Sequence, residues 1–192
     1  MTFDFRRPAF LAAAQAADDE KRASELEDQL ISLFDQLRDP LLRYLSSFGI
    51  STADSEEVVQ EAFLLLFRHL QTGKSRENLP GWLFRVVHNL GLKLRNQMRR
   101  DSETRANAGS EDFVRDPKPN PEDRAGTAQV KKHLLEVIKA LPEQDRRCLF
   151  LRAEGLRYRG IAEILDISLG TVALSLARSL ARIARAAEHY KL

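Results

Sequence analysis

The sequence predicts an all-α protein with two small helical domains joined by an acidic, proline-containing linker. Apolar residues recur at three- and four-residue intervals over residues 26–100 and again after Ala128, without the two-residue alternation of a sheet. Between Asp101 and Gly126 apolar residues nearly vanish, prolines cluster, and seven acids face four bases. We therefore expect an N-terminal extension (1–25), a first domain (26–100), a linker (101–127) and a second domain (128–192).

The composition is typical of a globular protein, with 43% hydrophobic and 30% charged residues. The net charge is only +2, so binding to nucleic acid would depend on local segregation of charge. The single cysteine, Cys148, excludes an internal disulfide and fits a cytoplasmic protein. No apolar run approaches the roughly 20 residues that span a bilayer, so no membrane insertion is expected. The alanine-rich start, Arg6 to Ala17, faintly resembles a secretion signal but is more typical of an N-terminal helix or tail.

The first domain opens with leucines spaced three or four residues apart, from Leu26 to Leu45. Asp39-Pro40 interrupts this pattern, and proline removes a helical hydrogen bond. We expect two helices here instead of one.

A further helix is predicted after Ser51, which forms a capping-box pattern with Asp54. Its apolar stripe, which includes Phe63, can face the core. The opposite face carries Glu57, Gln60 and Glu61. These residues could be a plain solvated face or a surface that binds a partner.

The next helix, predicted from Asn78 to Arg100, has a polar stripe without any acid between Gly81 and Arg100. Cations suit DNA phosphates, and asparagine can hydrogen-bond to base edges. Trp82 and Phe84 could stack on unpaired bases or belong to the core. The stripe consists of Arg85, Asn89, Lys93, Asn96 and Arg100.

The second domain contains a helix-turn-helix spacing: helix 158–165, a turn at 166–168, and a helix from Leu169. The alternative is a helical hairpin that touches no DNA. We expect Val172, Leu176, Leu180 and Ile183 to pack inward. A separate polar and basic stripe carries Thr171, Ser175, Arg178, Arg182 and Arg185.

No motif indicates catalysis, a cofactor or a metal. The four histidines, His69, His88, His133 and His189, lack metal-ligand spacing, and Cys148 lies beside apolar residues like a core residue. A glycine-rich phosphate loop and a catalytic triad are missing from the sequence. We therefore expect a protein that is not an enzyme.

Three segments in this order resemble an extracytoplasmic-function (ECF) sigma factor, over about Leu26 to Ile183. Residues 57–63 (EVVQEAF) resemble region 2.2, residues 82–89 (WLFRVVHN) regions 2.3 and 2.4, and the stretch from Leu141-Pro142-Glu143 through Arg178 region 4. The resemblance implies a subunit that binds core RNA polymerase, directs it to promoter DNA and is held by an anti-sigma factor.

Site residues follow from the same resemblance. The clamp of the largest polymerase subunit would be bound by Glu57, Gln60, Glu61 and Phe63, and region 4 would bind the flap of the second-largest subunit. The minus-10 element would be bound by Trp82, Arg85, Asn89, Lys93, Asn96 and Arg100. The minus-35 element would be bound by Arg159, Thr171, Ser175, Arg178 and Arg182.

Two positions depart from the family pattern. Ala173 and Ser175 stand where region 4 usually has basic residues, and Glu57 stands where aspartate is common. The loss of cations predicts minus-35 recognition that is weaker, shape-based or directed at AT-rich sequence through methyl groups. It also leaves open a sigma-like protein that holds polymerase without initiating transcription. The main competing reading is a transcription regulator that binds DNA by itself through the C-terminal unit, while the N-terminal bundle dimerises or senses a signal.

Overall fold

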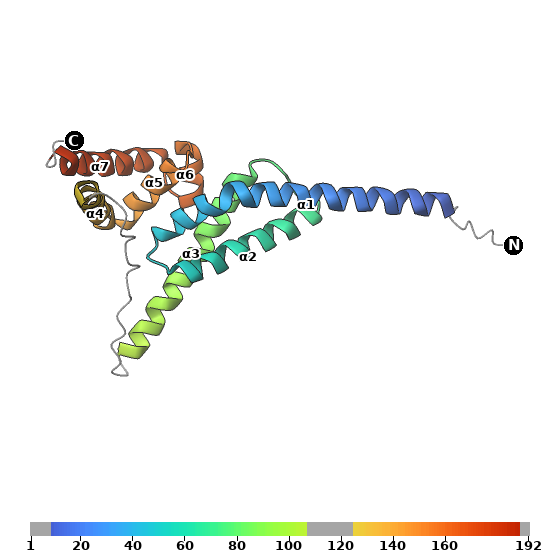
Figure 1. The fold of residues 1–192 in the computed structure, drawn as a ribbon, viewed down its shortest axis with the longest axis horizontal. Helices are drawn as coiled ribbons and strands as arrows, with labels where there is room; N and C mark the ends of the chain where they lie inside the picture. Colours follow the sequence, from blue (N-terminus) through green and yellow to red (C-terminus); the bar gives the residue numbers. More distant parts are fainter. Residues whose placement is uncertain (1–8, 107–124, 189–192) are drawn as a thin grey trace.

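The computed structural model describes residues 9–106 and 125–188, and within these ranges the chain is helical without strands. This confirms the predicted all-α class. Helices α1–α3 form one bundle and α4–α7 a second (Figure 1). The helices are α1 (Ala9–Ser46), α2 (Thr52–Gln71), α3 (Leu79–Ala106), α4 (Ala125–Lys139), α5 (Glu143–Ala153), α6 (Tyr158–Leu165) and α7 (Leu169–Glu188).

The prediction of two helices around Pro40 was wrong, because α1 runs unbroken through it. Proline costs one backbone hydrogen bond, but burial of the residues that follow can offset this. Leu41, Tyr44 and Leu45 are each fully buried in the turn and a half after Pro40.

The N-terminal half of α1 projects beyond the bundle (Figure 1), and the side chains of residues 20–25 are exposed. The predicted linker falls mostly on residues 107–124, outside the described ranges.

Aromatic packing between α1 and α3 forms the centre of the first bundle. The Tyr44 ring meets Phe48 and Phe84 edge-on, at centroid distances of 5.4 and 5.9 Å. Its hydroxyl is 2.7 Å from Nδ1 of the buried His88. A Cβ added to Gly91 would lie 2.9 Å from a methyl of Leu45, so glycine permits this close approach.

The second bundle packs α5, α6 and α7 around Cys148, which is fully buried. Burial raises the pKa of its thiol, which agrees with the predicted role of a small core residue. Leu180 was expected to face inward but is 58% exposed. Ser175 and Ser179 take the buried positions instead, beside the carboxylate-bearing Asp145. A buried carboxylate requires polar neighbours, and this requirement sets the rotation of α7.

The two bundles are docked on each other. Helix α5 contacts α1, and α6 contacts α3 (Figure 1). The first helix of the predicted helix-turn-helix therefore lies against the helix that carries the acid-free stripe.

We predict that His88 makes the stability of the protein pH-dependent. Burial, with a smaller contribution from the nearby Arg147 cation, lowers the pKa of His88 from 6.5 to about 4. The unfolded chain therefore binds more protons between these values, so stability present above about pH 6.5 is lost as the pH falls toward 4. A His88→Gln variant lacks this titratable group. Its free energy of unfolding should therefore fall by up to about 3 kcal/mol less, between pH 6.5 and 4, than that of the unaltered protein. Urea denaturation of both proteins across the window measures the difference, and parallel curves would contradict it.

Candidate nucleic-acid and polymerase interfaces

Helix α2 begins with the predicted capping interaction. The Ser51 hydroxyl oxygen accepts a hydrogen bond from the Asp54 amide at 3.1 Å and donates to the Asp54 carboxylate at 2.6 Å. This fixes the rotation of α2, whose acidic face (Glu57, Gln60 and Glu61) is exposed as predicted.

Phe63, predicted to bind polymerase, lies at the edge of the core. Its ring packs edge-on against Phe34 of α1 at 5.0 Å and is half-buried. It can therefore add apolar area to the acidic face while staying anchored to the bundle.

The acidic face borders a groove of about 150 Å³ between α2 and α3. Lys93, from the stripe predicted to bind DNA, lines the same groove as Glu57 and Glu61. The two predicted surfaces therefore adjoin along this groove. Its full lining is Asp54, Glu57, Val58, Glu61, Leu90, Lys93, Leu94 and Gln97.

The start of α3 positions the two aromatic residues differently. Asn78 adopts a left-handed conformation (φ 49°), and its side-chain oxygen accepts a hydrogen bond from the Gly81 amide at 3.2 Å. Phe84 is 2% exposed and belongs to the core. Trp82 is half-buried, with its ring 4.8 Å from that of His69. Only Trp82 of the two keeps a surface that a base could contact.

The polar stripe on α3 is exposed along its whole length. Arg85 is engaged, since its guanidinium donates a hydrogen bond to the backbone carbonyl of Glu163 in α6 at 2.8 Å. The α3 stripe, which the sequence predicted to bind DNA, therefore contacts the second domain near the N-terminal end of α3. The members of this α3 stripe are Arg85, Asn89, Lys93, Asn96 and Arg100.

Helices α6 and α7 have the geometry of a helix-turn-helix, with a bend of 105° between them. Asp166 ends α6 in a left-handed conformation (φ 53°). The Ser168 hydroxyl then caps α7 by accepting from the Thr171 amide at 3.1 Å.

The placement of Ser175 on an exposed DNA-facing stripe was wrong, because its side chain is fully buried. Arg178, from the same predicted stripe, makes two hydrogen bonds of 2.8 and 3.1 Å to the Asp145 carboxylate. Burial favours the protonated acid, but the hydrogen bonds from Arg178 and Ser175 hold the pKa of Asp145 below its ordinary value. Arg178 therefore supports the position of α7, a role that its spacing alone did not indicate.

The remaining predicted residues of the second domain are accessible. Arg159 and Arg182 are exposed, and Thr171 is half-buried with its hydroxyl 2.8 Å from Ser168. The structure adds Leu169 and Leu174, which are 51% and 62% exposed at the start of α7. Sequence reasoning missed them because leucine is normally assigned to the core.

The described residues contain no group of three or more histidines, cysteines or acids that could hold a metal ion. Across the same ranges no single helix is long and apolar enough to cross a membrane. Only the bent pair α6–α7 passes that test together, and its apolar residues include the buried core positions Ile161 and Val172.

Comparison with known proteins agrees with this arrangement. Residues 33–101 match the model for Sigma-70 region 2, and residues 132–183 match that for Sigma-70 region 4. The ECF RNA polymerase sigma-E factor of Escherichia coli K12 is 31% identical over 135 residues, covering 67% of this chain and 71% of the relative. The ECF sigma factor SigE of Mycolicibacterium smegmatis is 34% identical over 122 residues, covering 62% of this chain but only 46% of the relative.

The fold also matches a solved structure, the sigma factor RpoE of Bartonella quintana in complex with the anti-sigma factor NepR. The TM-score is 0.62 at 21% identity, and the match covers 84% of this chain and 98% of RpoE.

A region 2 bundle followed by a region 4 helix-turn-helix is the domain order of the sigma-70 family. Within that class, the chain belongs to the ECF sigma factor family.

We predict that Arg178 contributes to folding stability more than its neighbour Arg182. Replacing Arg178 with Gln leaves the Asp145 carboxylate, which is 2% exposed, without its cationic partner. The melting temperature should therefore fall for Arg178→Gln. Arg182→Gln removes the same charge one turn later from an exposed side chain and is the matched control. Equal melting temperatures for the two variants would contradict the assignment.

Proposed function

We propose that this chain binds core RNA polymerase, directs it to promoter DNA, and takes part in DNA melting and transcription initiation. The observation that carries the proposal is the position of the exposed, acid-free α3 stripe beside the acidic face of α2, in a chain with a helix-turn-helix. Catalysis belongs to the polymerase in this proposal, so the chain itself needs no cofactor.

The acidic face of α2 is the proposed contact to the clamp of the largest polymerase subunit. Glu57, Gln60 and Glu61 are exposed, and the half-buried Phe63 adjoins them. The glutamate at position 57 keeps the negative charge that the family pattern has there as aspartate. Region 4 is assigned to the flap of the second-largest subunit by family resemblance.

The α3 stripe is the proposed minus-10 contact. Its cations can neutralise phosphates, while Asn89 and Asn96 can hydrogen-bond to bases. Trp82, at the start of the same helix, offers a ring face to an unstacked base.

The helix-turn-helix is the proposed minus-35 reader, through Arg159, Thr171 and Arg182. The exposed Leu174 and neighbouring Ala173 favour apolar contact with thymine methyl groups, because these positions lack cations. AT-rich minus-35 sequence is the expected preference. Arg178 acts on this surface by holding α7 in place.

The remaining assignments follow from the family. An anti-sigma factor is the proposed inhibitory partner, and the cytoplasm, where the polymerase works, is the proposed location. The proposed functional domains are 26–100 for polymerase and the minus-10 element and 128–192 for the minus-35 element, flanking a linker at 101–127 and preceded by an extension at 1–25.

We predict that a Gln60→Ala/Glu61→Lys variant binds core polymerase about tenfold more weakly, because a charge of the wrong sign faces the partner. Pull-down with purified core enzyme in the absence of DNA measures this. Glu27→Lys is the control, since Glu27 is an exposed acid on a different helix, α1. If the unaltered chain does not bind core polymerase, the sigma-factor proposal fails and the independent DNA-binding regulator is favoured.

For the minus-10 contact, Asn89→Ala should reduce base discrimination by about 1 to 3 kcal/mol. Lys93→Ala should weaken binding to all DNA sequences alike. It should also reduce the slope of the logarithm of the binding constant against the logarithm of the salt concentration by about one. Run-off transcription with core polymerase and a genomic fragment library supplies the promoters, and titration of the holoenzyme with a selected promoter measures both effects. Lys74→Ala, which removes an exposed lysine from the loop after α2, is the control. Core binding without any transcript would instead favour the inert sigma-like protein.

A further inference from the structure

His69 lies in the last turn of α2, where it contacts both Trp82 of α3 and the loop 72–78 that joins the two helices. The centroid of its ring lies 4.8 Å from that of Trp82, and the two ring planes are inclined by 41°. Its Nε2 atom lies 2.9 Å from the backbone carbonyl oxygen of Ser75. Because a carbonyl oxygen can only accept a hydrogen bond, Nε2 carries the proton that is donated. The loop therefore fixes the imidazole while the imidazole contacts the indole.

The loop itself is anchored to the rest of the first bundle. The Ser75 hydroxyl oxygen accepts a hydrogen bond from the Glu77 amide at 3.2 Å. The Arg76 guanidinium donates to the side-chain oxygen of Gln29 in α1 at 3.3 Å. The carbonyl that accepts from His69 thus belongs to a loop whose conformation is held from two sides.

The core of the bundle covers only part of the Trp82 ring. The core-facing residues of the first turns of α3 are Leu79 and Leu83, which are 4% and 0% exposed. Trp82 packs beside them at the edge of the core and is half-buried. A tryptophan side chain has two rotatable bonds, so the exposed part of the indole would sample other orientations without a further contact. The ring of His69 supplies that contact.

Trp82 also lies at the end of the α3 stripe. It precedes Arg85 by three residues and Asn89 by seven, so the three side chains lie on one face of the helix. A base stacked on the indole would continue the row of DNA contacts proposed for this stripe. An indole that is already oriented avoids the entropic cost of being ordered when the base binds.

We propose that His69 is a positioning residue for promoter opening, which holds the indole of Trp82 in the orientation that receives an unstacked base. This inference rests on the proposed function. His69 acts through Trp82, without touching DNA itself. A role limited to closing the end of α2 would need the hydrogen bond to Ser75 but not the ring contact, so substitutions can separate the two roles.

The first test uses the free, full-length chain, in which Trp82 is the single tryptophan, so that its fluorescence reports on this indole alone. His69→Ala should make the fluorescence more easily quenched by acrylamide, because the ring contact is lost. His69→Phe keeps an aromatic ring and should restore the protection, whereas His69→Gln keeps an N–H donor without a ring and should not. Gln71→Ala, at an exposed position in the same turn of α2, is the matched control. Circular dichroism checks that each variant keeps its helices.

The second test measures binding of the chain, assembled with core polymerase, to a promoter fragment whose minus-10 segment is kept unpaired by mismatches. His69→Ala should bind this probe about fivefold more weakly, because the indole must then be ordered during binding. Binding to a fully paired random-sequence duplex should not change, since the phosphate contacts of the α3 stripe remain. In a Trp82→Ala background, His69→Ala should cause little further loss, because its effect passes through Trp82.

Equal quenching of the unaltered and His69→Ala proteins would overturn the inference, as would a full further loss of binding in the Trp82→Ala background. Restoration by Gln but not by Phe would limit His69 to the end of α2 and would also overturn it. If the unaltered protein with core polymerase does not prefer the mismatched probe to the duplex, the proposed minus-10 contact fails, and this inference with it. If that preference is present and His69→Ala binds equally well, only the positioning role fails.

Discussion

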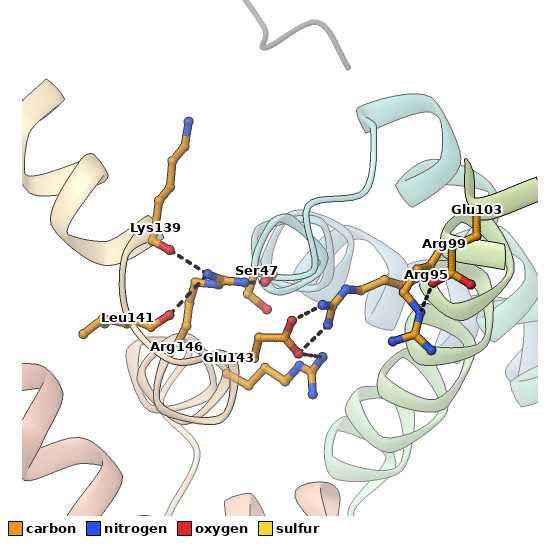
Figure 2. Close-up of polar contacts among 9 residues, drawn as sticks. Ser47, Arg95, Arg99, Glu103, Lys139, Leu141, Glu143 and Arg146 are labelled. Carbon is orange, nitrogen blue, oxygen red and sulfur yellow. Dashed lines mark hydrogen bonds and ion pairs between the residues drawn. The ribbon is translucent and has the colours of Figure 1, made fainter. Parts of the chain in front are cut away.

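The charge pattern of α3 is the constraint on which the arrangement of the molecule depends. The helix carries cations but has no carboxylate between Gly81 and Arg100, so these side chains find few partners on their own helix. In the folded chain Arg95 pairs with Glu143, and Arg85 takes the carbonyl of Glu163, both from the second domain. The same shortage of acids makes the exposed remainder of the stripe suitable for phosphates. The contacts to the second domain thus supply hydrogen-bond acceptors that α3 itself lacks, as Figure 2 shows for Arg95 and Glu143.

Burial decides which polar residues can act at the surface. Asp145 and Ser175 are buried together and engage Arg178, so a position with the spacing of a DNA contact instead fixes α7. Tyr44 and His88 form a similar polar pair in the first bundle, where burial keeps the histidine neutral over the ordinary pH range. These internal pairs hold rigid the helices that present the acidic face of α2 and the α3 stripe.

The candidate interfaces also differ in how they would distinguish partners. The acidic face of α2 offers charge with an anchored aromatic beside it, which suits a protein surface. The start of α7 offers Leu169 and Leu174 with few cations, which suits shape and methyl contacts more than bidentate hydrogen bonds. The groove lined by Lys93, Glu57 and Glu61 joins the surfaces of the first domain that are proposed to bind polymerase and DNA. Binding at one surface can thus alter the electrostatics of the other.

The sequence by itself determined the helical class, the cap at Ser51, the exposed face of α2, the α3 stripe and the turn at Asp166 to Ser168. Each of these depends on residues within one or two helical turns, where spacing dictates the face on which a side chain lies. Only the tertiary structure decided that α1 continues through Pro40, that Ser175 is buried while Leu180 is exposed, and that arginine side chains of each domain contact the other. Burial against distant helices outweighed local preference at Pro40 and along α7. The ion pairs Arg95–Glu143 and Arg43–Glu154 join residues 48 and 111 positions apart in the chain, which no local pattern can register.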